Sequence, residues 1–411
     1  MKRFVLLMAS LAISAVLNGC GGKGESVDAP PDFTAIAGDS LVTIAWTAVP
    51  GVDYWLFYAP GSGVTTTNWL TIGGRSILNV TPPYTLTGLV NGRTYSFTMN
   101  ARKNGGAGGP GAPTQVVVPR FAGTSWTVGS PLGTARLNGI SALVTTNVIV
   151  GAGGAIFSGA IGSVPVARTN PAAPVDLNAI TAATSGFMAV GKNGTAIFSA
   201  DATTWAARTT GTVADLNAVA SSGVVQYVAF GAAGTTIVSN DGTAWTTATS
   251  ATTKDLYAAT YGNGRYVAVG AQGTIVTSTD GAAWTAVASN TTSDLRGVVL
   301  GAFVTTTGTG AAATSTTTYL FVAAGANGTL VTSADGLAWT VRAPISTNTL
   351  NAVAFSGQFV VVGNAGSIYT SADGITWQVR PSGTLNDLTA LTRTTAGYVA
   401  VGAAGTYLTS Q

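Results

Sequence analysis

The sequence predicts an all-β protein: a small β-sandwich followed by a seven-bladed β-propeller that is closed by pairing its two ends. Three observations carry this prediction. Only 8% of the 411 residues are charged and 54 are glycine, a composition typical of many short strands joined by tight turns. Apolar residues alternate with a period of two in the segment before residue 119. A glycine pattern then recurs seven times, mostly every 38 to 40 residues.

The composition also excludes several kinds of site. The formal net charge of +3 reflects a shortage of acidic residues, and no cluster of Lys and Arg is present, so we expect no nucleic-acid partner. The chain has no histidine, and Cys20 and Glu25 are its only cysteine and glutamate. We therefore expect no internal disulfide, no Cys/His metal site and no cofactor.

Residues 1–19 have the layout of a lipoprotein signal peptide. Two basic residues precede an apolar run over residues 4–16, which is short for a membrane span. Leu17-Asn18-Gly19-Cys20 then resembles a bacterial lipobox. The resemblance implies that Cys20 is lipidated and anchors the chain in a membrane; the alternative is an ordinary signal peptide with a chance cysteine.

The resemblance to lipoproteins also implies a destination and a tether. It places the chain in the cell envelope, and Gly21 after the cysteine, rather than Asp, favours the outer membrane in a host with two membranes. Residues 20–29 are rich in glycine and polar residues, and we expect a flexible tether there.

Residues 30–119 predict the β-sandwich. Half-buried strands are expected at Leu41–Trp46, Tyr54–Tyr58, Tyr84–Leu89 and Thr94–Ala101, with a tight turn at Asn91-Gly92.

This strand set resembles a fibronectin type III domain. Trp46 matches the core tryptophan of the second strand, and Leu89 and Tyr95 match the Leu-x-x-Gly-x-x-Tyr turn of that family. The resemblance implies that the Tyr95 hydroxyl bonds back to the backbone and that the domain acts as a spacer or weak binder.

Gly38-Asp39-Ser40-Leu41 matches the motif of a lipase family with a serine nucleophile. That chemistry needs a base to accept the serine proton, and the chain has no histidine. We expect this segment to be only a turn between strands.

Residues 120–411 contain the seven repeats, which predict seven four-stranded blades. Each repeat has a Gly-x-x-Gly step between two alternating strands, preceded by a short strand that opens with leucine. The first glycines are Gly151, Gly191, Gly231, Gly270, Gly325, Gly363 and Gly402. The leucines are Leu137, Leu177, Leu216, Leu256, Leu295, Leu350 and Leu388.

Five repeats continue with Ser-x-Asp and then Trp. The pairs are Asp201/Trp205, Asp241/Trp245, Asp280/Trp284, Asp335/Trp339 and Asp373/Trp377. We expect the Asp to shape a hairpin turn and the Trp to pack between blades. Ala202 replaces the usual Gly in one copy, and the first repeat lacks both Asp and Trp, so its outer hairpin is expected to be irregular.

The repeated element resembles the Asp-box, or BNR, repeat, and the wider pattern resembles seven-bladed propellers of the photosystem II assembly-factor type. The seventh repeat ends at Gln411, where its own box should begin, and Gly123-Thr124-Ser125-Trp126 carries the missing part. We therefore expect the strand near Trp126 to pair with the C-terminal strand and close the ring.

One repeat spacing is 55 residues, between Gly270 and Gly325. The extra residues, about 305–318, are mostly Thr, Gly and Ala, and we expect them to lengthen a hairpin loop of the fifth blade. The loop is either simply mobile or a contact surface.

Acidic residues are too regular for a glycosidase site. From residue 120 onward there are ten aspartates; five belong to the boxes, and Asp176, Asp215, Asp255, Asp294 and Asp387 precede the repeat leucines. Glycoside hydrolysis needs carboxylates in contrasting environments. We therefore expect a non-catalytic protein, with a sialidase-like hydrolase or a lyase as the alternative.

The residue after each repeat leucine is expected to face the axis of the ring. These residues are Asn138, Asn178, Asn217, Tyr257, Arg296, Asn351 and Thr389. The ring could bind a peptide or glycan, and Tyr257 and Arg296 are then the strongest candidates because they interrupt the Asn pattern. Alternatively, the Asn side chains cap their own blades around a water-filled channel.

Together these features favour a surface lipoprotein whose propeller binds a protein or polysaccharide partner. A role in envelope assembly is a second hypothesis, and a carbohydrate-active enzyme is a third.

Overall fold

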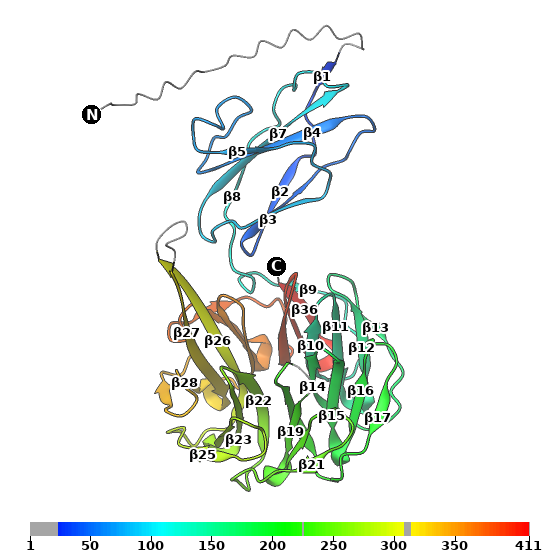
Figure 1. Ribbon diagram of the computed structural model, residues 1–411, viewed down its shortest axis with the longest axis vertical. Coiled ribbons are helices and arrows are strands. Elements are labelled where there is room, and N and C mark those ends of the chain that lie inside the picture. The colour runs from blue at the N-terminus through cyan, green and yellow to red at the C-terminus, as the bar shows by residue number, and fades with distance from the viewer. Residues whose placement is uncertain (1–23, 224–225, 308–313, 411) are drawn as a thin grey trace, which may run out of the picture. The chain divides into compact units, whose positions relative to one another are not determined.

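The computed structural model describes residues 24–223, 226–307 and 314–410, and within these ranges it holds strands and short 3-10 turns but no α-helix (Figure 1). The chain divides into two compact units, Met1–Pro119 and Arg120–Gln411. In the described ranges no helix is long and apolar enough to cross a membrane. The predicted signal peptide and Cys20 lie outside the described residues.

The first unit is a sandwich of two antiparallel sheets. One sheet has the order β1-β7-β4-β5 with β8 beside β7, and the other has the order β2-β3-β6. The strands are β1 (Glu25–Val27), β2 (Thr34–Gly38), β3 (Leu41–Ala45), β4 (Asp53–Pro60), β5 (Arg75–Ile77), β6 (Tyr84–Thr87), β7 (Tyr95–Lys103) and β8 (Gln115–Val117).

The predicted core and corner of the sandwich are present. Trp46 is buried and packs edge-on against Tyr54, with ring centroids 5.3 Å apart. The backbone N–H of Val90 donates a hydrogen bond to the Tyr95 hydroxyl at 3.2 Å, as the family turn implies.

The lipase-like segment is a turn, as predicted. It joins β2 to β3, with Ser40 at a positive φ of 57°. The Asn91 side chain holds this turn by accepting from the backbone N–H of Ser40 and donating to Asp39, each at 2.8 Å.

The second unit is a ring of seven four-stranded antiparallel sheets, numbered here as blades 1 to 7 along the chain (Figure 1). The inner strands are β10 (Leu137–Leu143), β14 (Leu177–Ala183), β18 (Leu216–Ser221), β22 (Leu256–Gly262), β26 (Leu295–Thr307), β30 (Leu350–Phe355) and β34 (Leu388–Thr394). Each inner strand contacts those of both neighbouring blades, and β10 contacts β34, so the ring is closed. The predicted seven-bladed fold is confirmed.

The second and third strands of each blade are joined by a 3-10 turn. The second strands are β11 (Thr146–Gly151), β15 (Gly186–Gly191), β19 (Tyr227–Gly231), β23 (Arg265–Gly270), β27 (Thr314–Gly325), β31 (Phe359–Gly363) and β35 (Gly397–Gly402). The turns are η1 (Ala152–Gly154), η2 (Lys192–Gly194), η3 (Ala232–Gly234), η4 (Ala271–Gly273), η6 (Ala326–Gly328), η7 (Asn364–Gly366) and η8 (Ala403–Gly405). The third strands are β12 (Ile156–Ala160), β16 (Ala196–Ser199), β20 (Thr236–Ser239), β24 (Ile275–Ser278), β28 (Leu330–Ser333), β32 (Ile368–Ser371) and β36 (Tyr407–Ser410).

The outer strands complete the blades. They are β13 (Val166–Ala167), β17 (Ala206–Arg208), β21 (Thr246–Thr247), β25 (Thr285–Val287), β29 (Thr340–Arg342), β33 (Gln378–Arg380) and β9 (Thr127–Val128), which belongs to blade 7.

Close backbone approach explains the Gly-x-x-Gly step. A Cβ on Gly191 would lie 2.0 Å from the carbonyl oxygen of Asp176, and one on Gly194 would lie 1.9 Å from that of Thr212. Gly194 also has a positive φ of 67°, which favours glycine. Both positions therefore admit no larger residue in this geometry.

The Ser-x-Asp segments form turns that we call box turns, each ending in a Trp between blades. In the box turn of blade 4, an Asp280 carboxylate oxygen accepts hydrogen bonds from the backbone N–H groups of Ala282 and Ala283, both at 2.9 Å. These bonds hold the pKa of Asp280 below its usual range. Trp284 then packs against Phe230 of the preceding blade, with ring centroids 5.0 Å apart.

The other box turns repeat this geometry. Asp201, Asp241, Asp335 and Asp373 each accept from two backbone N–H groups of their own turn, and the pKa of each is lowered. Ala202 has a positive φ of 63°, in the same left-handed region as the box glycines, whose φ values are 71° to 77°.

Blade 7 has a box turn split between the two ends of the propeller. Strand β9 pairs with β36, with Thr127 opposite Thr409 (Figure 1). The Ser410 hydroxyl accepts from the backbone N–H of Gly123 at 2.7 Å, just as Ser278 accepts from Gly281 at 2.9 Å. The Trp126 indole N–H donates to the Gly123 carbonyl at 2.9 Å. The predicted closure is confirmed.

The insertion in blade 5 is an extension of paired strands rather than a lengthened loop. After a register shift between Leu295 and Gly297, β26 and β27 remain paired in one register from Gly297↔Ala324 out to Thr307↔Thr314. The expected hairpin is therefore present, but its Thr-rich arms form a two-stranded ribbon because Thr suits extended backbone. Residues 308–313 lie outside the described ranges.

Removing residues 120–130 should open the ring, because β36 would lose its partner and present an unpaired edge. Loss of the Trp126 indole alone costs about 3 kcal/mol, so we expect the thermal midpoint of the propeller to fall by roughly 10 °C, with concentration-dependent aggregation. The control is Trp205→Ala, which removes an indole but leaves the ring closed and should not aggregate. Undiminished stability of the shortened chain would contradict the closure.

Candidate functional site

The candidate site lies where the inner strands begin. The seven repeat leucines are fully buried, and the residue after each is half-buried or exposed. This is the division of roles that the sequence predicts. We call these seven following positions the inner ring.

Four inner-ring asparagines hold the next blade, and Asn351 also donates to Asn364 of its own blade at 2.8 Å. The Asn138 amide donates to the carbonyl oxygen of Leu177 at 2.9 Å, and Asn178 donates to that of Leu216 at 3.0 Å. The equivalent bonds run from Asn217 to Leu256 at 3.2 Å and from Asn351 to Leu388 at 2.8 Å. The backbone carbonyl that each of these four amides holds therefore belongs to the neighbouring blade, whereas the alternative expectation placed the caps on their own blades.

Thr389 makes the equivalent hydrogen bond between the last blade and the first. Its hydroxyl donates to the carbonyl oxygen of Leu137, so blade 7 holds blade 1 as the asparagines hold their neighbours. Five of the seven junctions therefore carry an inner-ring hydrogen bond from a short polar side chain.

Tyr257 and Arg296 occupy the inner-ring positions of blades 4 and 5, where this pattern stops. Neither has the carboxamide that makes the bond elsewhere. The Arg296 guanidinium lies 5.0 Å from the centroid of the Tyr257 ring, and it also pairs with Asp294 at 3.1 Å. Arg296 is exposed, so its remaining donors face solvent. The structure thus brings the two predicted residues together.

The local charges act on the Tyr257 hydroxyl. Partial burial raises its pKa most, the negative charges of Asp294 and Asp255 raise it further, and Arg296 lowers it. The hydroxyl therefore stays protonated at neutral pH and can donate a hydrogen bond.

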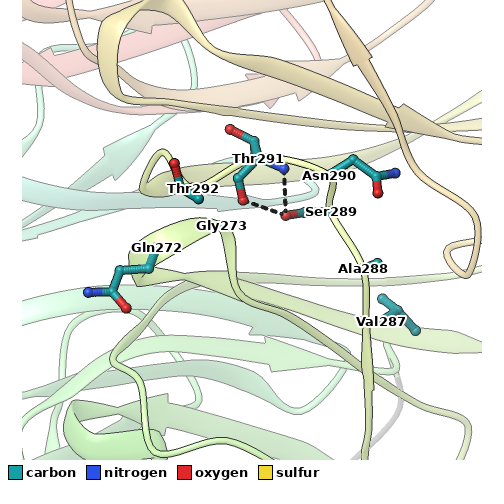
Figure 2. A pocket seen from close by; sticks show the side chains of 8 residues that line it. All are labelled: Gln272, Gly273, Val287, Ala288, Ser289, Asn290, Thr291 and Thr292. Atoms are coloured by element: carbon teal, nitrogen blue, oxygen red, sulfur yellow. Dashed lines mark hydrogen bonds between the residues drawn. The ribbon is translucent and has the colours of Figure 1, made fainter.

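Asp294 connects this pair to the surface beside it. One of its oxygens accepts from the backbone N–H of Gln272 at 3.0 Å, and the other accepts from Arg296. Gln272 belongs to a recess of about 640 Å³ between the turn η4 and the connection Val287–Thr292 (Figure 2).

The recess is polar and largely backbone-lined. Figure 2 shows Gln272 and Asn290 at opposite ends of it, with the Ser289 hydroxyl bonded to the backbone of Thr291 between them. Asn290 is committed to the fold, because its amide donates to the carbonyl of Trp339. The exposed Gln272 amide is the side chain of the recess that remains best placed for a ligand.

The five aspartates that precede the repeat leucines also have a structural role that the sequence did not reveal. Asp176, Asp215, Asp255, Asp294 and Asp387 each accept from a backbone N–H in the 3-10 turn of the preceding blade, at 2.7 to 3.0 Å. All ten aspartates of the propeller thus bind backbone amides. The recurring Asp-Leu pair was the available signal. Among the described residues, no cluster of three or more His, Cys, Asp or Glu could hold a metal.

Comparison with known proteins agrees with this architecture. Residues 28–117 match the fibronectin type III domain family. No curated protein sequence matches the chain. The propeller is similar to solved structures of the same fold.

Three of these structures are representative. YCF48 bound to D1 peptide is 15% identical, with a TM-score of 0.54, and the match covers 71% of this chain and 98% of YCF48. YCF48 from Cyanidioschyzon merolae is 17% identical, with a TM-score of 0.53 and coverage of 69% and 98%. The RRP9 WD40 repeats are 10% identical, with a TM-score of 0.54 and coverage of 71% and 98%. Identities this low establish the shared fold alone.

Replacing Tyr257 by Asn should complete the inner-ring hydrogen bond of blade 4. The new amide should reach the Leu295 carbonyl as Asn217 reaches Leu256, and we expect the free energy of unfolding to rise by up to about 1 kcal/mol. Chemical denaturation of the full chain measures this. The matched control is Asn217→Ala, which should lower stability by a similar amount. A loss of stability in Tyr257→Asn would contradict the equivalence of the two positions.

Proposed function

We propose that this protein is a non-catalytic lipoprotein of the cell envelope whose propeller binds a protein partner at the Tyr257–Arg296 pair. The fibronectin type III domain serves as a spacer, and the box turns are Asp-box repeats with a structural role. A polysaccharide partner is the other outcome that the binding test below distinguishes.

The observation that carries the proposal is the break in the inner ring. Five junctions use Asn or Thr to hold the neighbouring blade, whereas two adjacent junctions carry an aromatic ring and a guanidinium instead. Positions that depart from a stabilising repeat pattern, as these two do from the inner-ring hydrogen bond, are concentrated at functional sites. Tyr and Arg are also the residue types most enriched at the energetic centres of protein interfaces.

Two further features support a peptide as ligand. The exposed Arg296 guanidinium and the protonated Tyr257 hydroxyl offer hydrogen-bond donors suited to carboxylate or carbonyl oxygens. A propeller of this fold, YCF48, has been solved bound to a peptide. The carbohydrate-active alternative has no comparable support, because every aspartate of the propeller already binds backbone amides.

The binding test is a pull-down from envelope extract with the full chain as bait. We expect Arg296→Ala to weaken capture of a specific protein about tenfold or more. Truncating a hot-spot residue costs about 2 kcal/mol or more, and about 1.4 kcal/mol corresponds to a tenfold change in affinity. Tyr257→Asn should weaken it while preserving stability.

Arg342→Ala, on the outer strand β29, is the control and should bind as the wild type does. A partner retained equally by all variants would contradict the site. Loss of binding only after glycosidase treatment of the extract would indicate a polysaccharide, and turnover of a glycan by the purified protein would indicate the enzymatic alternative.

The membrane anchor depends on Cys20. Acyl chains attached there would hold the chain firmly, whereas a single chain binds only marginally. Cys20→Ser should therefore move the protein from the membrane fraction to the soluble fraction of its host, as fractionation and immunoblotting would measure. The control is Ser26→Ala in the same region, which should remain in the membrane fraction, and an unchanged distribution of Cys20→Ser would contradict the anchor.

A further inference from the structure

Blade 1 lacks the tryptophan that each of the other six blades places against the blade before it. At the other junctions, an indole from a box turn lies between the two blades. The six tryptophans are Trp126, Trp205, Trp245, Trp284, Trp339 and Trp377. The core between blades 7 and 1 contains no tryptophan among its described members.

The second strand of blade 1 is also altered at the position that supports these indoles. The other six blades carry a buried Phe or Tyr there: Phe187, Tyr227, Tyr266, Phe321, Phe359 and Tyr398. Blade 1 carries Asn147, which is fully buried, and neither of its amide atoms has a hydrogen-bond partner of ordinary geometry. Asn147 lies close enough to the Tyr407 hydroxyl to lower its pKa, against a larger opposing effect of burial.

A cavity of about 240 Å³ lies at this junction. Blade 7 contributes Tyr398, Val399 and Tyr407, and blade 1 contributes the turn of residues 161–164. Val399 corresponds to Val228 of blade 3, and a Cβ on the box glycine Gly281 would lie 2.9 Å from Val228. In blade 1 the turn of residues 161–164 stands in the place of a box turn, but a Cβ on its Gly162 would meet nothing within 4 Å. The cavity is therefore the space left between this turn and blade 7.

The cavity adjoins a second one with a positive charge. Ile161 and Thr394 line both, and the second, of about 290 Å³, also includes Arg393. No Asp or Glu lines either cavity, and Arg393 is the only charged residue among the lining residues. An occupant with negative charge is therefore favoured.

We propose that the junction of blades 7 and 1 is a docking site for an acidic peptide segment of a partner protein, which inserts a tryptophan side chain. The occupant is inferred from the chain itself, because the six equivalent junctions are filled by an indole, and in five of them the indole follows a box aspartate. The site is separate from the Tyr257–Arg296 pair and does not depend on it.

The probe for this site is the chain's own box sequence, an acetylated and amidated heptapeptide Ser-Ala-Asp-Gly-Ile-Thr-Trp with a fluorinated indole. We expect saturable 1:1 binding to the full-length chain by ¹⁹F NMR. Changing the peptide Trp to Ala should weaken binding at least about tenfold, because the buried indole supplies most of the apolar contact. Absence of saturable binding, or no effect of that change, would overturn the proposal.

Variants of the protein show where the peptide binds. Ala396 lines the cavity, and Ala396→Trp should fill it and block peptide binding. Ser185→Trp, at the equivalent turn of blade 2, should bind the peptide as the wild type does. Val164 is exposed at the edge of the cavity, and Val164→Glu should weaken peptide binding by placing a negative charge there. This variant tests the site if Ala396→Trp does not fold. Arg393→Gln should reduce the salt dependence of binding.

Tyr257→Asn should leave peptide binding unchanged, which separates this site from the proposed function. Equal binding to the wild type, Ala396→Trp and Val164→Glu would place the peptide elsewhere and refute the docking site.

Discussion

The propeller depends on the pairing of β36 with β9. A ring of blades has no free end only if its first and last strands meet, and here they meet inside one blade and one box turn. Ser410 comes from the end of the chain, while Gly123 and Trp126 come from the start of the propeller. Because a single turn needs both ends, the ring cannot form stepwise and remain stable while open, and exposed strand edges are avoided.

Closure is reinforced by side chains that link each blade to the next. Near the axis, Asn and Thr hold the neighbouring leucine carbonyl. At the 3-10 turns, aspartates hold backbone amides of the preceding blade, as Asp387 does with Ala365. Between the sheets, box tryptophans fill the apolar space. In these devices and in the box turns, all ten aspartates of the propeller accept hydrogen bonds from backbone amides, so its few acidic side chains serve to satisfy backbone polar groups.

The two candidate binding sites are the places where these devices are missing. At blades 4 and 5, Tyr257 and Arg296 replace the inner-ring hydrogen bond, and a Tyr–Arg–Asp cluster faces solvent. Between blades 7 and 1, the tryptophan is missing and a cavity remains. Repetition makes such departures informative, because each position has six internal references with the same backbone.

The sequence by itself determined the all-β class, the number of blades, the turn at Ser40 and the closure at Trp126, because period-two alternation, glycine spacing and the divided box turn are local patterns. It also singled out Tyr257 and Arg296 as exceptions. Only the tertiary structure decided that Asn138 bonds to Leu177 rather than to its own blade, that Asp294 accepts from the backbone of Gln272, and that the buried Asn147 lies beside Tyr407. These contacts join residues about 20 to 40 positions apart, or opposite ends of the propeller, and the curvature of the ring, which no local pattern encodes, brings them together.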